Sequence, residues 1–263
     1  EASKVRDAKL LTMREELDSI FDALVKNRDD QAKAMNYKDF VELGYYSRGR
    51  NSYGTEEVKN FRDQVKKYLV PFASELHDER RERLGLDVLD FVDEGVHFLN
   101  GNPSPTGTPD EIFEAGKKMY NELSPETSEF FNFMIDHELF DVLGRPNKMA
   151  GGYMDMLPDY KAPIIFANFN GTSGDIDVLT HECGHAFQGF VTRYYDILEH
   201  NDITMETAEV HSMSMEFFTS KWMDLFFGDR ADDFRKVQLE DAIQFIPYGC
   251  MVDEFQEIIY SNP

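Results

Sequence analysis

Apolar and charged positions alternate at helical intervals along the first hundred residues. From Ala2 to about Asn27 an apolar residue recurs every three to four positions with charges between, a pattern that predicts an amphipathic helix. A second helix is predicted from a cap at Thr55 to about Leu84. It is expected to bend near Pro71, because proline lacks a backbone N–H. We expect residues 1–100 to form one helical lobe.

The pattern changes after residue 100. The segment Asn100–Pro109 is dominated by Gly, Pro, Ser and Thr, which predicts a loop at a boundary between regions. Ser124 followed by Pro125 has the form of an N-cap and a first helical position, so a helix is predicted to begin there. Residues 101–263 are therefore expected to form a second region.

One segment of this second region has the pattern of a strand. The apolar run Ile164–Phe169 lies in a stretch, Gly144–Asp175, in which Gly and Pro break any helical period. Further helices are predicted from near Asp175 and from about Thr204 to Phe227. The predicted fold is mainly α, with a small β-sheet.

Composition and charge exclude several classes of partner. The chain has 27 Lys plus Arg against 50 Asp plus Glu, a formal charge of -23, which repels nucleic acid and anionic lipid. No run of about 20 apolar residues is present to span a membrane. Acidic surfaces of this kind are typical of soluble proteins, so the charge does not identify a substrate.

The cysteines and the first residue bear on location and completeness. With only two cysteines, Cys183 and Cys250, a disulfide scaffold is not indicated, and we expect a reducing compartment such as the cytoplasm. The chain begins at Glu1 with no leader pattern, so we expect the true N-terminus to be missing. The sequence does not indicate an oligomeric state.

The predicted helix after Asp175 contains the motif His181-Glu182-Cys183-Gly184-His185. Residues four apart lie on one helical face, so His181 and His185 can bind one Zn²⁺ ion. Glu182 is then placed to act as the general base, removing a proton from a water whose pKa zinc lowers towards ~7. The motif predicts a metallopeptidase site.

A catalytic zinc ion needs a third protein ligand and one open position. The metzincin arrangement is excluded, because Gln188 and Val191 stand where it requires Gly and His. In the next predicted helix, Glu206, Glu209 and Glu216 share one face.

Glu209 is the preferred third ligand. Met205, Ser212 and Met213 are expected to surround it with a largely apolar wall, and Glu206 is the alternative. Two Glu side chains on this face would be costly to bury without a partner.

Other polar residues near the motif are candidates for supporting roles. Asp177 and Glu216, and Glu206 if it is not the ligand, are placed to orient ligand histidines. His211 lies two residues from Glu209 and is predicted to point away from it as a structural histidine. Helix geometry also keeps Cys183 off the metal.

The predicted strand and the turn after it are the candidate substrate-binding segment. An extended peptide can pair with an exposed sheet edge, and glycine permits close approach of two backbones. The alternative is an ordinary buried strand and turn. The residues assigned to substrate binding are Phe166, Ala167, Asn168 and Gly171.

The motif at 181–185, together with the segment Glu209–Glu216, resembles the oligoendopeptidase F and thimet oligopeptidase family of zinc peptidases. The segments Arg145–Tyr153 and Pro163–Asn168 are also similar to that family. The resemblance implies a zincin-type helical peptidase core with the sheet beside the active site. It implies oligopeptide substrates cut in a channel between helical lobes. It also implies one Zn²⁺ held by His181, His185 and Glu209, with Glu182 as base.

Two departures from the family pattern set the alternative hypothesis. Gln188 stands where many members have His, and members continue beyond the Glu-bearing helix to a His- and Tyr-bearing segment that closes the site. By resemblance the chain is a central-to-C-terminal fragment of a zinc endopeptidase. The alternatives are a catalytically incomplete fragment that binds zinc and peptide, and a structural zinc protein with a closed four-ligand site.

Overall fold

A computed structural model describes residues 2–201 and 203–263. It comprises two compact units: unit 1 contains residues 1–74 and 243–263, and unit 2 contains residues 75–242. This division differs from the predicted one after residue 100, which falls inside unit 2. The end of the chain joins the N-terminal helices through contacts between residues that are distant in sequence.

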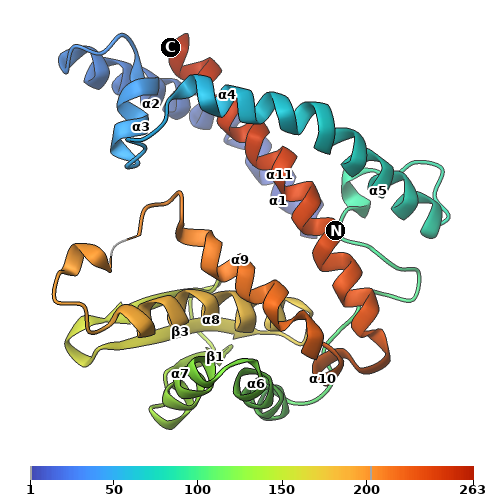
Figure 1. Cartoon of the computed structure of the whole chain (residues 1–263). Coiled ribbons are helices and arrows are strands. Elements are labelled where there is room, and N and C mark those ends of the chain that lie inside the picture. The colour runs from blue at the N-terminus through green and yellow to red at the C-terminus, as the bar shows by residue number, and fades with distance from the viewer. Residues whose placement is uncertain (1, 202) are drawn as a thin grey trace. The chain divides into compact units, whose positions relative to one another are not determined.

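The regular elements in the described part of unit 1 are all helices (Figure 1). Its elements are α1 (Ala2–Thr12), α2 (Arg14–Ala34), α3 (Phe40–Ser47), α4 (Thr55–Gln64), a π-helical turn (Val65–Leu69), the start of α5 (Val70–Arg83) and the end of α11 (Ala231–Ser261). The helix predicted over residues 2–27 is found as two helices that meet at Met13 and extend further.

The helical run predicted from Thr55 to about Leu84 is present as α4, the π turn and α5. The π turn ends at Leu69. Helix α5 begins at the next residue, Val70, and its first turn contains Pro71. Proline cannot donate to the helical ladder, and local widening of the helix accommodates the missing hydrogen bond. The predicted irregularity near Pro71 therefore takes the form of a π turn.

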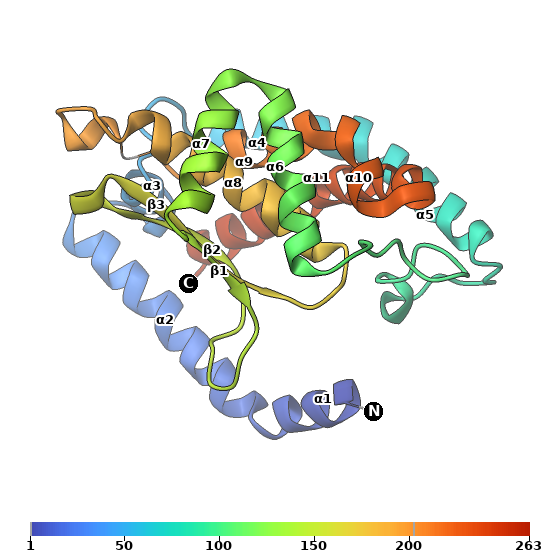
Figure 2. The ribbon, with the colours of Figure 1, turned by 90° about the horizontal axis from the view of Figure 1, so that it is seen from below.

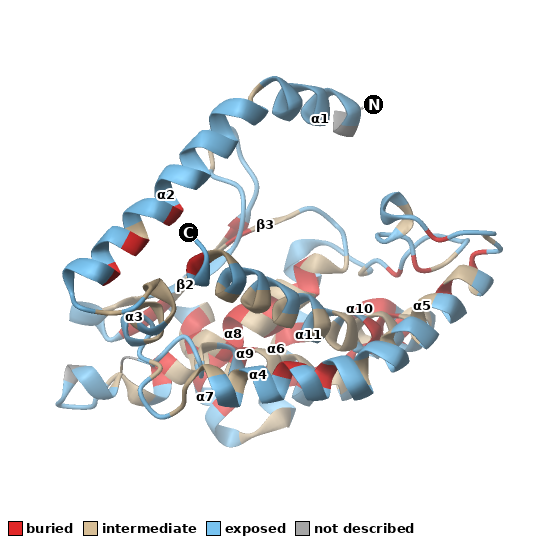
Figure 3. Ribbon diagram, turned by 90° about the horizontal axis from the view of Figure 1, so that it is seen from above, coloured by how far each residue is buried: buried red, intermediate tan, exposed pale blue. Residues whose placement is uncertain are grey.

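The core of unit 1 is small and depends on ion pairs. On α2, Val25 and Ala32 are buried, whereas most apolar residues of α1 and α2 are exposed (Figure 3). Arg62 of α4, with a side chain 4% exposed, pairs with Asp253 at 2.5 Å and with Glu257, both on α11. These contacts attach the end of the chain to α4.

Unit 2 contains the sheet. Its regular elements are α6 (Pro109–Leu123), α7 (Pro125–Asp136), β1 (Phe140–Leu143), β2 (Tyr153–Leu157), β3 (Ala162–Phe169), α8 (Gly174–Thr192), α9 (Ala208–Phe218) and α10 (Asp224–Phe227), with the end of α5 and the start of α11. Short 3₁₀ turns lie at Phe91–Asp93, Pro158–Tyr160, Leu198–His200, Thr219–Trp222 and Gly228–Arg230. The mainly α prediction with a small sheet is confirmed.

The sheet has the strand order β1-β3-β2. β1 runs parallel to β3, and β2 runs antiparallel to it with Met154 opposite Ile165. The sequence analysis predicted β3 and missed the other two strands. β1 and β2 are four and five residues long, too short for a period of two to stand out.

Helix α8 lies at the centre of unit 2, between α9, the sheet, and the pair α6 and α7 (Figures 1 and 2). The predicted start of α7 is confirmed, because the Ser124 hydroxyl accepts a hydrogen bond from the Thr127 N–H. The buried side chains of Phe130, Phe131 and Leu179 belong to one apolar core that joins α7 to α8.

The helix predicted over residues 204–227 is shorter than expected. It begins at Ala208 and ends at Phe218, and a 3₁₀ turn and α10 follow. Glu206 therefore lies in the turn before α9 instead of on its face. The longest helix, α11, was not predicted. Among the described residues, no helix combines the length and apolar character that crossing a bilayer requires.

Candidate metal centre

Helix α8 begins in a turn that one carboxylate closes. Asp175 accepts hydrogen bonds from the backbone N–H groups of Asn170, at 2.9 Å, and Gly171, at 2.7 Å. Gly171 has a φ of +82°, a conformation that favours glycine. The turn passes the chain directly from β3 into α8, which packs against β2 and β3.

Helices α8 and α9 cross with their backbones in contact at Gly184. A Cβ atom at this position would lie 2.5 Å from Cα of Ser212 and 2.7 Å from the carbonyl oxygen of His211. No side chain larger than hydrogen fits there without a backbone shift. The glycine of the motif therefore brings the two histidines opposite the acid of α9.

Three ligand atoms converge at this crossing. Oε2 of Glu209 lies 3.1 Å from Nε2 of His181 and 3.4 Å from Nε2 of His185. Among the described residues, these three form the group whose geometry suits a metal ion, with all ligand atoms within 4.8 Å of one another. Ligands about 2.0–2.2 Å from a tetrahedral zinc ion lie about 3.4 Å apart. The donor set and spacing fit zinc.

Glu216 contacts the first histidine of the motif. Its Oε1 lies 2.6 Å from Nδ1 of His181. Hydrogen bonding to this carboxylate raises the pKa of His181, and burial acts in the opposite direction. With its Nδ1–H donated to Glu216, His181 keeps the Nε2 lone pair for a metal. The contact is compatible with the supporting role predicted for Glu216, which stays a prediction.

His211 contacts the second histidine, with its Nε2 3.0 Å from Nδ1 of His185. Burial lowers the pKa of both side chains, which favours a neutral pair. A neutral His185 that donates its Nδ1–H to His211 leaves its own Nε2 free for a metal. The sequence analysis missed this contact because it considered the direction of His211 only within its own helix.

Glu209 has the environment of an anionic ligand. Burial alone would raise its pKa, but a hydrogen bond from the Ser212 hydroxyl at 2.7 Å and the nearby histidines lower it. The predicted apolar wall is wrong in one respect, because Met205 is exposed in the turn before α9. Glu206 is exposed in the same turn and is outside the three-residue group.

Glu182 belongs to α8, and its carboxylate lies beside the Met154 backbone of β2. The residue is 8% exposed. Burial raises its pKa, while the charge of His181 and the Met154 backbone N–H lower it. A carboxylate with a raised pKa is a stronger base, as proton transfer requires. The next residue, Cys183, is fully buried in the apolar core, away from the ligand atoms.

Asp177 lies one helical turn before His181. Burial, followed by the negative charges of Glu216 and Asp241, raises its pKa to about 7. Within the described chain its carboxyl makes no hydrogen bond to either ligand histidine. The nearby charge of His181 acts on this carboxyl directly and lowers its pKa, against the larger effect of burial.

The hypothesis that substrate pairs with an exposed edge of β3 is wrong. β3 is the middle strand, paired with β1 and β2. The Ala167 carbonyl accepts a hydrogen bond from Nζ of Lys148 at 2.6 Å. Asn168 donates to the carbonyls of Met149 and Gly151 at 2.9 and 3.0 Å. Residues of the loop before β2 thus contact the end of β3, past its pairing with β2.

Phe166 packs against Tyr153 of β2 with a ring separation of 5.1 Å. Together with Ala167, Asn168 and Gly171, it belongs to the structure that holds β2 and the turn in place. Within the described residues, β2 hydrogen-bonds to β3 on one side only, and it also packs against α8. The free edge nearest the metal ligands therefore belongs to β2.

Several solved structures are similar to this chain in fold and in sequence. A solved structure of Pz peptidase A with an inhibitor has 52% sequence identity and a TM-score of 0.92, and the match covers 100% of this chain and 47% of that one. A structure described as oligoendopeptidase F has 50% identity and a TM-score of 0.92, covering 100% and 46%. Another so described, from Bacillus anthracis, has 49% identity and a TM-score of 0.90, covering 100% and 49%.

The chain spans about half the length of these similar proteins. No curated protein matches it. The profile of Peptidase family M3 matches residues 119–262, a segment that contains the sheet, the motif helix α8 and the acid-bearing helix α9. The chain belongs to peptidase family M3.

Proposed function

We propose that the chain is the metal-binding and general-base part of a zinc-dependent endopeptidase that hydrolyses oligopeptides. The observation that carries the proposal is the convergence of His181 Nε2, His185 Nε2 and Glu209 Oε2 beside the buried Glu182. Membership of a peptidase family supports the same reaction class.

Each residue has a role that follows from its contacts. When bound, zinc supplies Lewis-acid activation of water and of the peptide carbonyl. Glu182 accepts a proton from the attacking water and delivers it to the leaving amine, which its raised pKa favours. Glu216 and His211 hold the ligand histidines so that each Nε2 faces Glu209.

The free edge of β2 is the proposed binding surface for an extended peptide. The Met154 N–H acts on Glu182, which places the backbone of this strand beside the base. An added strand would gain main-chain hydrogen bonds there. Phe166, Ala167, Asn168 and Gly171 then contribute to substrate binding by holding β2 and the turn before α8.

A catalytically incomplete fragment that binds zinc and peptide is the second candidate. It is favoured by the coverage of the similar structures, which are about twice as long as this chain. Groups that stabilise the oxyanion of the reaction are worth about 10²–10³ in rate. A chain without them would bind zinc and turn over slowly.

Hydrolysis of a quenched fluorescent peptide by zinc-loaded protein separates the two candidates. We expect Glu182→Gln to retain zinc and lose activity, whereas Glu114→Gln, on the exposed surface of α6, behaves as the parent chain. Equal rates for the parent and Glu182→Gln, with zinc bound in both, would refute the enzyme proposal for this chain. Peptide binding measured by fluorescence anisotropy would then support the second candidate.

We also infer a cytoplasmic location, an oligopeptide partner, and no binding to nucleic acid or membranes. Both Cys183 and Cys250 are free thiols, as expected in a reducing compartment. The formal charge of -23 opposes binding to phosphate-rich polymers and to anionic lipid. Cell fractionation and a nucleic-acid binding assay at low salt test these inferences.

A further inference from the structure

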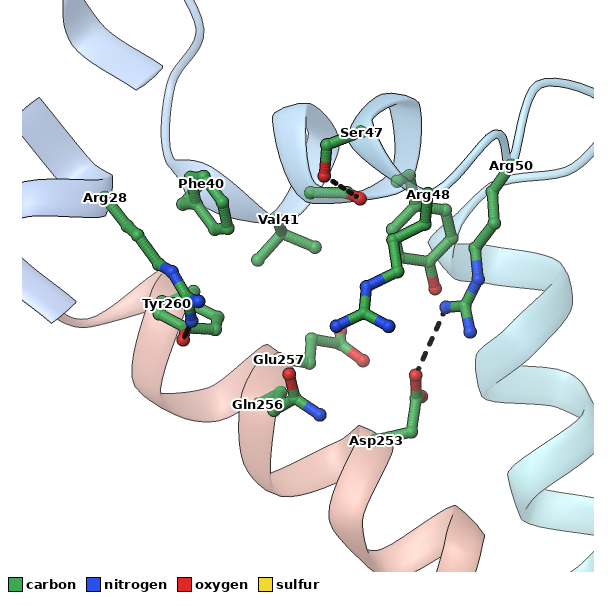
Figure 4. Close-up of a pocket in the computed structure, with 12 residues that line it drawn as sticks. Arg28, Phe40, Val41, Ser47, Arg48, Arg50, Asp253, Gln256, Glu257 and Tyr260 are labelled. Carbon is green, nitrogen blue, oxygen red and sulfur yellow. Dashed lines mark hydrogen bonds and ion pairs between the residues drawn. The ribbon is translucent and has the colours of Figure 1, made fainter. Parts of the chain in front are cut away.

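Unit 1 contains a cavity of about 190 Å³ whose lining is unusually rich in arginine (Figure 4). It is formed by α2, by α3 and the residues after it, and by the end of α11. Three arginines line it, from three different places in the chain: Arg28, Arg48 and Arg50. Three aromatic rings lie beside them: Phe40, Tyr45 and Tyr260.

The two carboxylates in the cavity wall both pair with Arg62, which lies outside the cavity lining. Asp253 accepts from Nη1 of Arg62 at 2.5 Å, and Glu257 pairs with Nη2 of the same guanidinium. Arg50 lies at a longer distance, 3.4 Å, from Asp253. Arg62 thus shares one positive charge between the two acids, and Arg50 adds a second contact to Asp253.

Arg28 and Arg48 have no carboxylate partner within the described chain. Arg28 donates to the Tyr260 hydroxyl and lies 5.4 Å from the ring centres of Phe40 and Tyr260. The side chain of Arg48 extends into the cavity above Gln256 and Glu257 (Figure 4). Arg28 and Arg48 therefore bring positive charge to the cavity that no carboxylate of the described chain pairs, in a chain whose net charge is strongly negative.

Helix capping does not account for this arrangement. Arg48 is the C-cap residue of α3, where a positive charge is favourable. That argument does not apply to Arg28, which lies on α2, and Arg50, beyond the helix end, is held by its ion pair with Asp253. Arg50 is held over the Tyr45 ring at 5.0 Å, so aromatic contacts fix two of the three guanidiniums.

We propose that this cavity binds a small oxyanion, a carboxylate or phosphate group. Guanidinium groups match both anions through paired N–H donors, and immobilised arginines lose less entropy on binding. The cavity is smaller than the usual 300–1,000 Å³ of a drug-sized ligand site, so it accepts an anionic group of a few heavy atoms. The site depends on no residue of the metal centre.

Calorimetric titration of the full chain with inorganic phosphate and with succinate tests the proposal. Ionic strength is held constant with sodium chloride, so that general screening does not differ between samples. We expect saturable binding to the parent chain, and Arg48→Gln to weaken it about tenfold or more. Arg14→Gln is the matched control, because Arg14 lies on α2 outside the cavity with a side chain 74% exposed. It is expected to bind as the parent does.

Arg28→Gln and Arg50→Gln provide independent tests, and circular dichroism shows whether each variant is folded. The affinities for phosphate and succinate identify which oxyanion the site prefers. No saturable binding of either anion to the parent, or unchanged affinity in folded Arg48→Gln and Arg28→Gln, overturns the proposal. Glu182→Gln is expected to bind the anion with the affinity of the parent chain. The anion-binding proposal can therefore be tested even if the peptidase proposal fails.

Discussion

Gly184 of α8 lies against the backbone of Ser212 of α9, so closely that a Cβ atom at Gly184 would stand 2.5 Å from the Ser212 Cα. Ser212 is fully buried and donates from its hydroxyl to Glu209. One contact thus sets the helix separation and places the acid of α9 within reach of His181 and His185.

Replacing Gly184 with alanine is expected to push α9 away from α8. We expect a destabilisation of about 1–3 kcal/mol, as for other overpacked sites, and a loss of zinc affinity of about tenfold or more. Urea unfolding and competition with a zinc chelator measure the two effects. Gly189→Ala is the control, because its Cβ would meet the flexible Met156 side chain instead of a backbone. Parental zinc affinity in Gly184→Ala would contradict the argument.

The third ligand is tested by two matched substitutions. Glu209→Gln removes the carboxylate that faces both Nε2 atoms, and zinc affinity should fall by more than the about 10–100-fold typical of residues that only orient ligands. Glu206→Gln, in the turn before α9, should bind zinc nearly as the parent does. Chelator competition requires no enzymatic activity. The reverse order of affinities would assign the ligand to Glu206.

Glu216 is expected to act through His181. Glu216→Gln keeps a hydrogen-bond acceptor but removes the charge, so we expect zinc affinity to fall about 10–100-fold. The pKa of His181 in the metal-free protein should also fall, because hydrogen bonding to Glu216 is the main cause that raises it. NMR titration of the histidines measures this change. An unaltered His181 pKa in the variant would show that Glu216 has no such role.

The buried ion pair between Glu240 and Arg83, at 3.0 Å, predicts a pH-dependent stability. Burial alone would raise the pKa of Glu240, but the close contact with His97 at 3.6 Å and the hydrogen bonds from Arg83 lower it to about 2. A carboxyl with a depressed pKa stabilises the fold above its unfolded value of about 4.3, and this contribution is lost as pH falls towards 2.

Glu240→Gln should therefore cost about 3 kcal/mol at neutral pH, because Arg83 is left without its partner. The difference from the parent should shrink steadily between about pH 4.5 and 2. Urea unfolding at a series of pH values measures it, with the exposed Glu114→Gln as the comparison. A difference between Glu240→Gln and the parent that is independent of pH would exclude the ion pair as its source.

Local features of the sequence were enough for several parts of the structure. The spacing of His181 and His185 is a property of one helix, so it could be recognised without knowing what packs against it. Ser124 and Pro125 marked the start of α7 because capping involves only neighbouring residues. The one long apolar run identified β3, whereas the shorter β1 and β2 carried too few residues for a pattern.

The features decided by tertiary structure all involve contacts between elements. Glu206 does not lie on the face that carries Glu209 and Glu216, because α9 begins only at Ala208. His211 contacts His185 because Gly184 allows α8 and α9 to pack with their backbones in contact. β3 became a central strand because two short strands pair with it.

The sequence by itself determined one half of the candidate metal centre and the proposed general base, since His181, Glu182 and His185 are neighbours on one helix. Only the packing of α9 onto α8 determined the other half, because a periodic pattern shows which way a side chain points from its own helix but not what it meets.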